Sequence, residues 1–143
     1  MNLIERIDHW ATAVPERIAH ISGARTLTYR ELCRRSHALA VHITERCGDD
    51  RSPIAVLGHR EPEMLIAFLG AVKSGRPYVP LDAALPQTRI DTILASSHAA
   101  LVLTPDQIRE FSRLNFAGRR GPSKIATRSI SCSQAAAAVN RKA

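Results

Sequence analysis

Aromatic side chains are scarce in this sequence: they make up only 4% of its 143 residues. A surface that stacks bases or sugars needs several such rings, so the composition argues against one. No apolar run approaches the ~18 residues that a membrane-spanning helix needs. Residues 1–6 are charged and amphipathic and lack the apolar stretch of a secretory signal. We therefore expect a cytoplasmic protein with no membrane span.

Cysteine pairs of the kind that bind metals are also missing. Cys33, Cys47 and Cys132 form no CxxC motif, and no histidine lies near them at a zinc-binding spacing. We expect Cys33 within a helix, Cys47 at its end, and all three as reduced thiols in a reducing compartment.

Acidic residues are absent from residues 113–143, which contain seven Lys or Arg. Residues 1–112 carry equal numbers of acids and bases, so this tail accounts for the whole net charge of +7. A basic tail could bind nucleic acid or another anionic surface. Here Phe116 is the only aromatic residue of the tail, and no helix-turn-helix or zinc pattern precedes it. Nucleic-acid binding is therefore the less favoured hypothesis.

Two helices are expected to begin at capping boxes. Asn2 precedes apolar residues at helical spacing, and Glu5 follows three residues later. Thr28 and Glu31 repeat this arrangement, and the second helix is expected to end at Gly48.

A third helix is expected to begin near Pro62, with Glu61 and Glu63 at the positive end of its dipole and Gly75 just after its end. Its expected apolar face consists of Met64, Leu65, Phe68, Leu69 and Val72.

Short apolar runs alternate with these helical patterns. Residues 53–57 and 99–103 are typical of buried strands, and the proline-bracketed run 77–80 is typical of an edge strand. Residues 18–28 predict a hairpin, and Pro86 opens a fourth helix. Such alternation predicts the α/β class: βαβ units with a mostly parallel sheet flanked by helices.

Two segments carry a family resemblance. Residues 27–32, LTYREL, and residues 72–82, VKSGRPYVPLD, are similar to the first two core motifs of the adenylate-forming, or AMP-binding, ligases. Pro86 and Arg89 follow at the expected places. That superfamily includes acyl-CoA synthetases and the adenylation domains of nonribosomal peptide synthetases. Within it, residues 53–73 most resemble the D-alanine–D-alanyl carrier protein ligases, also called D-alanine–poly(phosphoribitol) ligases.

The resemblance implies a function. Members of this family use ATP and Mg²⁺ to convert D-alanine to its adenylate. They then transfer it to the phosphopantetheine thiol of a carrier protein, for D-alanylation of teichoic acid.

The resemblance covers roughly residues 1–104, which we interpret as an incomplete N-terminal subdomain. Residues 105–143 are then an unmatched basic tail, expected to be disordered. The family continues with a Gly/Ser/Thr-rich phosphate loop ending in lysine, whereas residues 119–124, RRGPSK, contain one glycine and follow no apolar strand. A ribose-binding acid and a catalytic lysine of the family have no counterpart here either. The sequence therefore nominates no catalytic, cofactor-binding or metal-ligating residue, and Asp82 is interpreted as a loop acid with a local hydrogen bond.

These observations predict a ligase fragment that is inactive by itself and needs no cofactor of its own. A frameshift after about residues 103–112 would explain the change in composition, and a genuine disordered tail is the alternative. A second hypothesis is one half of a split ligase, completed by a second chain that carries the phosphate loop. In either case, a cut-short sheet keeps an open edge, so low stability or aggregation is expected.

Overall fold

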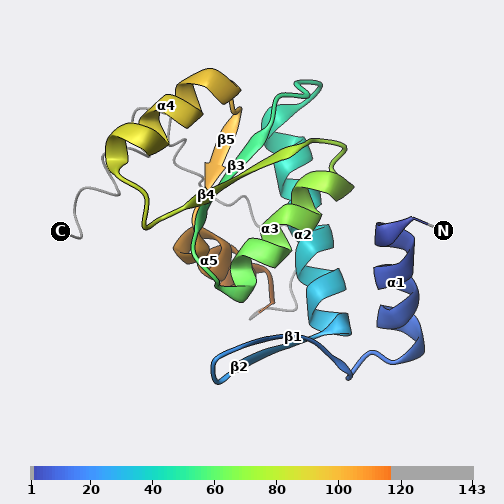
Figure 1. The fold of residues 1–143 in the computed structure, drawn as a ribbon. Helices are drawn as coiled ribbons and strands as arrows, with labels where there is room; N and C mark the ends of the chain where they lie inside the picture. The colour runs from blue at the N-terminus through green and yellow to red at the C-terminus, as the bar shows by residue number, and fades with distance from the viewer. Residues whose placement is uncertain (1, 117–143) are drawn as a thin grey trace.

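The computed structural model describes residues 2–116, which form an α/β structure with a parallel sheet between layers of helices (Figure 1). The helices and strands follow one another as α1 (Leu3–Ala13), β1 (Ile18–Ser22), β2 (Arg25–Thr28), α2 (Tyr29–Cys47), β3 (Ile54–Gly58), α3 (Pro62–Lys73), β4 (Tyr78–Asp82), α4 (Gln87–Ser97), β5 (Leu101–Leu103) and α5 (Pro105–Phe116). The α/β class, the order of the elements and the parallel sheet confirm the sequence prediction.

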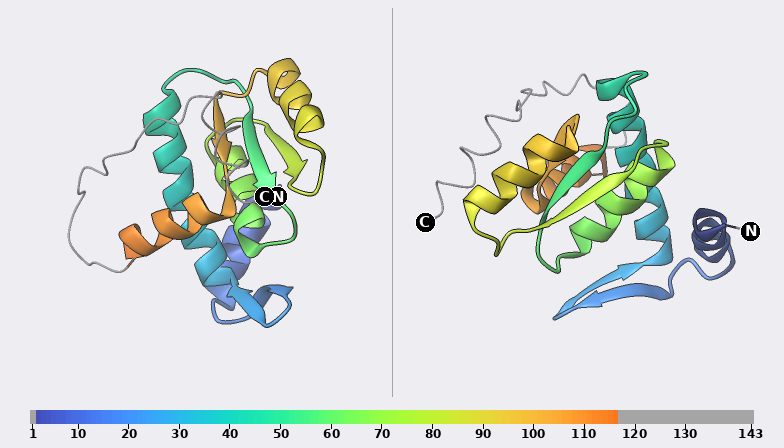
Figure 2. Two further views of the ribbon diagram at one scale, coloured as in Figure 1. Left: turned by 90° about the vertical axis from the view of Figure 1, so that its left-hand side faces the viewer. Right: turned by 45° about the horizontal axis from the view of Figure 1, so that its top comes forward.

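Strand β3 is the centre of the sheet, whose order is β4-β3-β5. Both neighbours pair with β3 in parallel, and every residue of β3 is buried. Successive side chains of a strand point to opposite faces, so β3 contributes to two cores. Ile54 and Val56 pack with α2, α3 and α5, whereas Ala55 and Leu57 pack with α4. Figure 2 shows the sheet between these two layers.

The predicted helix starts are confirmed in detail. Asn2 accepts a hydrogen bond from the Glu5 amide at 3.0 Å, and the Glu5 carboxylate accepts one from the Asn2 amide at 2.8 Å. Thr28 and Glu31 form the same reciprocal pair at the start of α2. Gly48 ends α2 with φ of 54°, a value that glycine adopts without the strain that a Cβ would cause.

The expected apolar face of α3 is wrong in part. Val72 is 42% exposed, whereas Ile66, Ala67 and Ala71, which the prediction left out, are fully buried. Helix α3 lies between the sheet and α2, so it is buried around most of its circumference. Its buried residues therefore do not form the single apolar stripe of a surface helix. Leu69 and Met64 are buried as expected.

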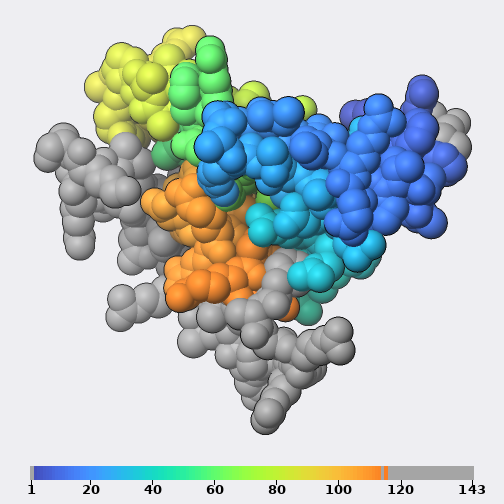
Figure 3. Space-filling model, turned by 90° about the horizontal axis from the view of Figure 1, so that it is seen from below, coloured from blue at the N-terminus to red at the C-terminus, as the bar shows by residue number. Residues whose placement is uncertain are grey.

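The prediction that a disordered tail begins at residue 105 is also wrong. Residues 105–116, which the sequence analysis placed in a disordered tail, form helix α5. Thr104 and Gln107 exchange hydrogen bonds between side chain and backbone, at 2.9 and 3.4 Å, and so cap this helix. Ile108 of α5 is 1% exposed in the core, and α5 lies beside the hairpin and α2 on the face shown in Figure 3. The tail prediction for residues 117–143 lies outside the described residues.

Candidate functional site

A cleft of about 780 Å³ lies where strands β3 and β4 end. The β1–β2 hairpin forms one wall, the loop after β3 and the first turns of α3 form the floor, and the end of β4 forms the other wall. The lining residues are His20, Ile21, Ser22, Gly23, Gly58, His59, Arg60, Glu61, Met64, Leu65, Phe68, Pro80, Leu81 and Asp82.

The chain connections explain why a cleft forms here. After β3 the chain turns to α3 on one face of the sheet, and after β4 it turns to α4 on the opposite face. Two adjacent parallel strands whose connections leave on opposite faces open a crevice at their carboxyl ends. In α/β sheets such crevices are the usual ligand sites.

The polar rim of the cleft is a hydrogen-bonded set. Asp82 Oδ1 accepts hydrogen bonds from the Ala84 amide at 2.9 Å and from His59 Nδ1 at 3.1 Å. The Ala84 bond first, and the His59 bond next, hold the pKa of Asp82 below its ordinary value. A carboxylate can only accept, so His59 carries a proton on Nδ1. The predicted local hydrogen bond of Asp82 is the one from the Ala84 amide, but Asp82 is the last residue of strand β4 and not a loop residue, and its bond with His59 joins segments 23 residues apart.

The hairpin is tied to this rim as well. Ser22 Oγ donates a hydrogen bond to the Arg60 carbonyl at 2.9 Å, and the His59 amide donates one to Glu61 Oε2 at 2.6 Å. The loop after β3 is therefore fixed from the hairpin on one side and from the start of α3 on the other.

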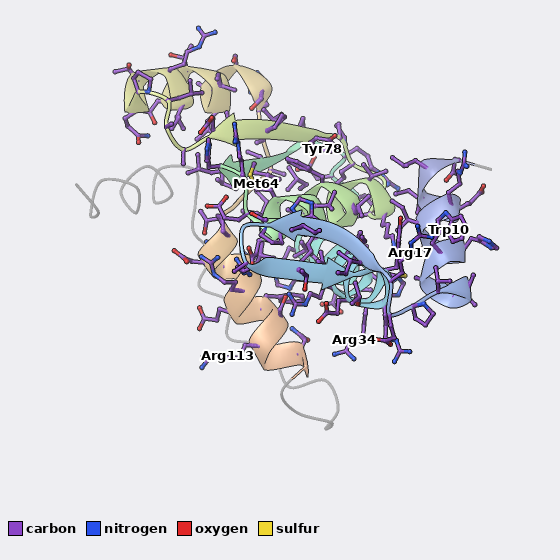
Figure 4. All side chains as sticks on the ribbon, turned by 60° about the horizontal axis from the view of Figure 1, so that its bottom comes forward. Trp10, Arg17, Arg34, Met64, Tyr78 and Arg113 are labelled. Carbon is purple, nitrogen blue, oxygen red and sulfur yellow. The ribbon has the colours of Figure 1, made fainter. Side chains whose placement is uncertain are left out.

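The floor of the cleft is apolar and closely packed. Met64 lies against the end of β3 (Figure 4), where a Cβ added to Gly58 would lie 2.9 Å from its Cγ and Sδ atoms. A side chain at position 58 would therefore force the Met64 side chain to move. Phe68 stacks on Tyr78 with ring centroids 4.4 Å apart and an interplanar angle of 23°. Apolar groups of a ligand or of another protein segment would be desolvated on this floor.

Below the cleft, a buried carboxylate joins three elements. Glu63 in α3 is 1% exposed and pairs with Arg25 of β2 and with Arg109 of α5, the latter at 3.5 Å. Burial acts to raise the pKa of Glu63, but the hydrogen bond and charge of Arg25, together with the charge of Arg109, outweigh it and leave the pKa below its ordinary value. The sequence analysis placed Glu63 only at a helix start. Its partners lie 38 and 46 residues away, and no local pattern indicates them.

The described lining of the cleft combines polar and apolar groups. It offers two imidazoles (His20 and His59), two carboxylates (Glu61 and Asp82), the guanidinium of Arg60 and an apolar floor. Within residues 2–116 no three His, Cys, Asp or Glu side chains gather in a way that could hold a metal ion. No helix in that part of the chain is long and apolar enough to cross a membrane.

Sequence comparison gives one family and a group of similar proteins. A family model described as "AMP-binding enzyme" matches residues 7–142, a range that runs past residue 104, where we ended the resemblance. D-alanine–D-alanyl carrier protein ligase of Bacillus mycoides is 43% identical over 108 residues, which is 76% of this chain and 21% of that protein. The D-alanine–D-alanyl carrier protein ligase of Bacillus anthracis is 43% identical over 104 residues, which is 73% of this chain and 21% of that protein. The chain thus spans about a fifth of the length of these relatives.

Solved structures give the same picture. A nonribosomal peptide synthetase bound to α-methyl-L-serine-AMP superposes with a TM-score of 0.69 at 30% identity, covering 77% of this chain and 12% of that one. The N-terminal subdomain of NpsA from Klebsiella oxytoca, in complex with 3-hydroxyanthranilyl-AMSN, superposes with a TM-score of 0.68 at 25% identity. That match covers 87% of this chain and 34% of the subdomain.

Proposed function

Because this chain belongs to the AMP-binding enzyme family, we propose that it is part of an ATP-dependent ligase that activates D-alanine as its adenylate. The observation that carries the proposal is the 43% identity with D-alanine–D-alanyl carrier protein ligases over 108 residues. By this analogy the activated D-alanine passes to a thiol of a carrier protein, and the pathway that uses it is D-alanylation of teichoic acid.

We infer that adenylation requires groups that this chain does not supply by itself. A carboxylate oxygen attacks the α-phosphorus of ATP, the bond between the α- and β-phosphates breaks, and pyrophosphate leaves. Stabilising that charge takes aligned backbone donors, Mg²⁺ and a lysine, and the loss of a single such donor in an enzyme costs roughly 10²–10³ in rate.

The side chains present offer little for these roles. The sequence has three lysines, Lys73, Lys124 and Lys142. Lys73 is engaged with Asp8 away from the cleft, and the other two lie outside the described residues. Asp82 Oδ1 accepts hydrogen bonds from Ala84 and His59, and within residues 2–116 no three His, Cys, Asp or Glu side chains gather around it as a Mg²⁺ site would need. We infer that this chain supplies the start of the sheet and the cleft, and does not by itself adenylate D-alanine.

The test is ATP–pyrophosphate exchange with D-alanine and Mg²⁺ on the purified 143-residue chain. The full-length Bacillus mycoides ligase serves as the positive control, and a Lys124→Ala variant of this chain gives the baseline. We expect exchange with the full-length ligase and a signal at the baseline with this chain. Exchange by the chain above the Lys124→Ala baseline would overturn the inference.

A further inference from the structure

The two edges of the parallel sheet differ in the backbone groups that they present. At the start of β4 the Pro77 carbonyl accepts a hydrogen bond from β3 at 2.9 Å. Backbone groups along a strand face its two sides in alternation, so those of Tyr78, Pro80 and Asp82 face away from β3. Pro80 has no N–H group, so a strand added to this edge would lack a donor at its middle.

The edge of β5 has no such gap. The Ala100 amide donates a hydrogen bond to the Pro53 carbonyl at 2.9 Å, so the backbone groups of Ala100 face β3. By the same alternation Leu101 and Leu103 direct their N–H and C=O groups away from β3, and each offers one donor and one acceptor. Figure 2 shows β5 on the side of β3 opposite to β4, and within residues 2–116 no strand pairs with the outer side of β5.

The side chains of β5 are already covered on both faces of the sheet. Val102 is 8% exposed and packs with Leu94 of α4, whereas Leu103 is 6% exposed and packs with Ile108 of α5. The strand contains no charged residue and no proline, two of the devices by which sheet edges avoid unwanted pairing. An apolar strand added here would therefore extend the sheet between two existing layers of helices.

The chain connections leave the outer side of β5 to a segment that is not reached through α5. From β3 the chain crosses to β4 through α3, and from β5 it continues into α5 on the same face of the sheet. Crossovers between parallel strands are right-handed in about 98% of cases, so two crossovers on one face lead in the same direction. A parallel strand reached through α5 would by this rule lie on the β4 side of β5.

We propose that the outer edge of β5 is the docking site for the rest of an adenylate-forming ligase, supplied as a separate polypeptide that adds one extended apolar strand. This inference rests on the proposed function. The choice of partner comes from the relatives, of which this chain covers 21% of the Bacillus mycoides ligase and 34% of the NpsA subdomain. Both proteins thus contain a large part that this chain does not match. Main-chain hydrogen bonds to Leu101 and Leu103 would provide the attachment, as in other cases of strand addition.

The experiment co-expresses this chain with a tagged Bacillus mycoides ligase from which the 108 aligned residues are removed, and measures how much of this chain is retained through the tag. We expect Leu101→Pro, which removes an outward N–H group, to lower the retained amount by about tenfold or more. Leu101→Ala is the matched control, because it shortens the same side chain and keeps the N–H group. It should be retained like the unchanged chain. Equal retention of the two variants, or no retention of the unchanged chain, overturns the proposal.

A second measurement needs no substitution and decides the matter if Leu101→Pro fails to fold. Amide hydrogen exchange, resolved to single residues by mass spectrometry, is compared for this chain alone and in the complex. We expect exchange of the Leu101 and Leu103 amides to slow by about tenfold or more, and exchange of the Tyr78 amide on the other edge to stay unchanged. Slower exchange at Tyr78 with no change at Leu101 and Leu103 places the partner on β4 and overturns the proposal.

The docking site and the proposed function fail in different ways. ATP–pyrophosphate exchange with D-alanine is measured on the same complex. Docking at β5 without this activity would support the docking site and contradict the proposed function. Activity that Leu101→Pro leaves unchanged would support the function and overturn the docking site.

A second copy of this chain is the competing occupant of the edge. Gel filtration of the chain alone distinguishes it from a ligase fragment. We expect a monomer, and a dimer that Leu101→Pro dissociates would overturn the proposal, because the edge would then pair with its own copy.

Discussion

Removing Arg25 should destabilise the protein more than removing the carboxylate that it pairs with. Glu63 is 1% exposed, whereas the Arg25 side chain is 48% exposed and can return to water. Arg25→Gln leaves a buried carboxylate with Arg109 at 3.5 Å as its remaining cation. Breaking a buried ion pair in this way costs about 3–5 kcal/mol, and the remaining arginine reduces the expected cost to about 2–3 kcal/mol.

Replacing Glu63 instead leaves Arg25 and Arg109 without the carboxylate, and solvent reaches both arginines. Glu63→Gln keeps a polar amide in the same space, and we expect a cost of about 1–2 kcal/mol. Urea unfolding at neutral pH, followed by circular dichroism, measures both values. Arg17→Gln is the matched control, because Arg17 is an exposed arginine beside the same hairpin and should change the stability by less than about 0.5 kcal/mol. An Arg25→Gln cost equal to that of Arg17→Gln, or smaller than that of Glu63→Gln, refutes the reasoning.

The same pair predicts a pH dependence. The pKa of Glu63 is lowered in the folded protein, so its contribution to stability is present above the unfolded-state value, about 4.3, and is lost as the pH falls through the folded-state value. The difference in unfolding free energy between the natural chain and Arg25→Gln should therefore shrink as the solution is made acidic. A difference that stays constant from neutral to acidic pH argues against the ion pair as its source.

Three further changes test the packing and the caps by thermal unfolding. Gly58→Ala should cost about 1–3 kcal/mol, because the added methyl group meets Met64. The cost of Gly58→Ala should be smaller when it is measured in a Met64→Ala variant, and an equal cost there would point to another cause. Thr28→Ala should cost about 1 kcal/mol through the lost cap of α2, and a neutral effect would contradict that role. Ile43→Ala should cost about 2–5 kcal/mol by opening a cavity in the core, and a cost near zero would mean that the site is not packed as described.

The features that the sequence predicted correctly are local. A capping box such as Thr28–Glu31 is complete within four residues, and a buried strand such as β3 is visible as an apolar run that ends at Gly58. Helix α5 had local signals too, in the Thr104–Gln107 pair and in Ile108, but we did not use them and assigned residues 105–116 to the tail because the family resemblance ended at residue 104.

The features that the sequence did not predict depend on contacts between distant segments. Glu63 finds Arg25 and Arg109 only after the hairpin, α3 and α5 are packed together. The cleft exists because β3 and β4 are followed by helices on opposite faces, which no short window of sequence encodes. The contacts of Asp8 in α1 with Cys33 in α2 and Lys73 in α3 likewise form only when three helices are in place.

Titration calorimetry of the purified chain with ATP and Mg²⁺ tests the central claim most directly. We expect no measurable heat of binding, at concentrations where the full-length Bacillus mycoides ligase gives a saturable isotherm. Saturable, stoichiometric binding of ATP to this chain alone would contradict it, because these residues would then hold the nucleotide without the rest of a ligase.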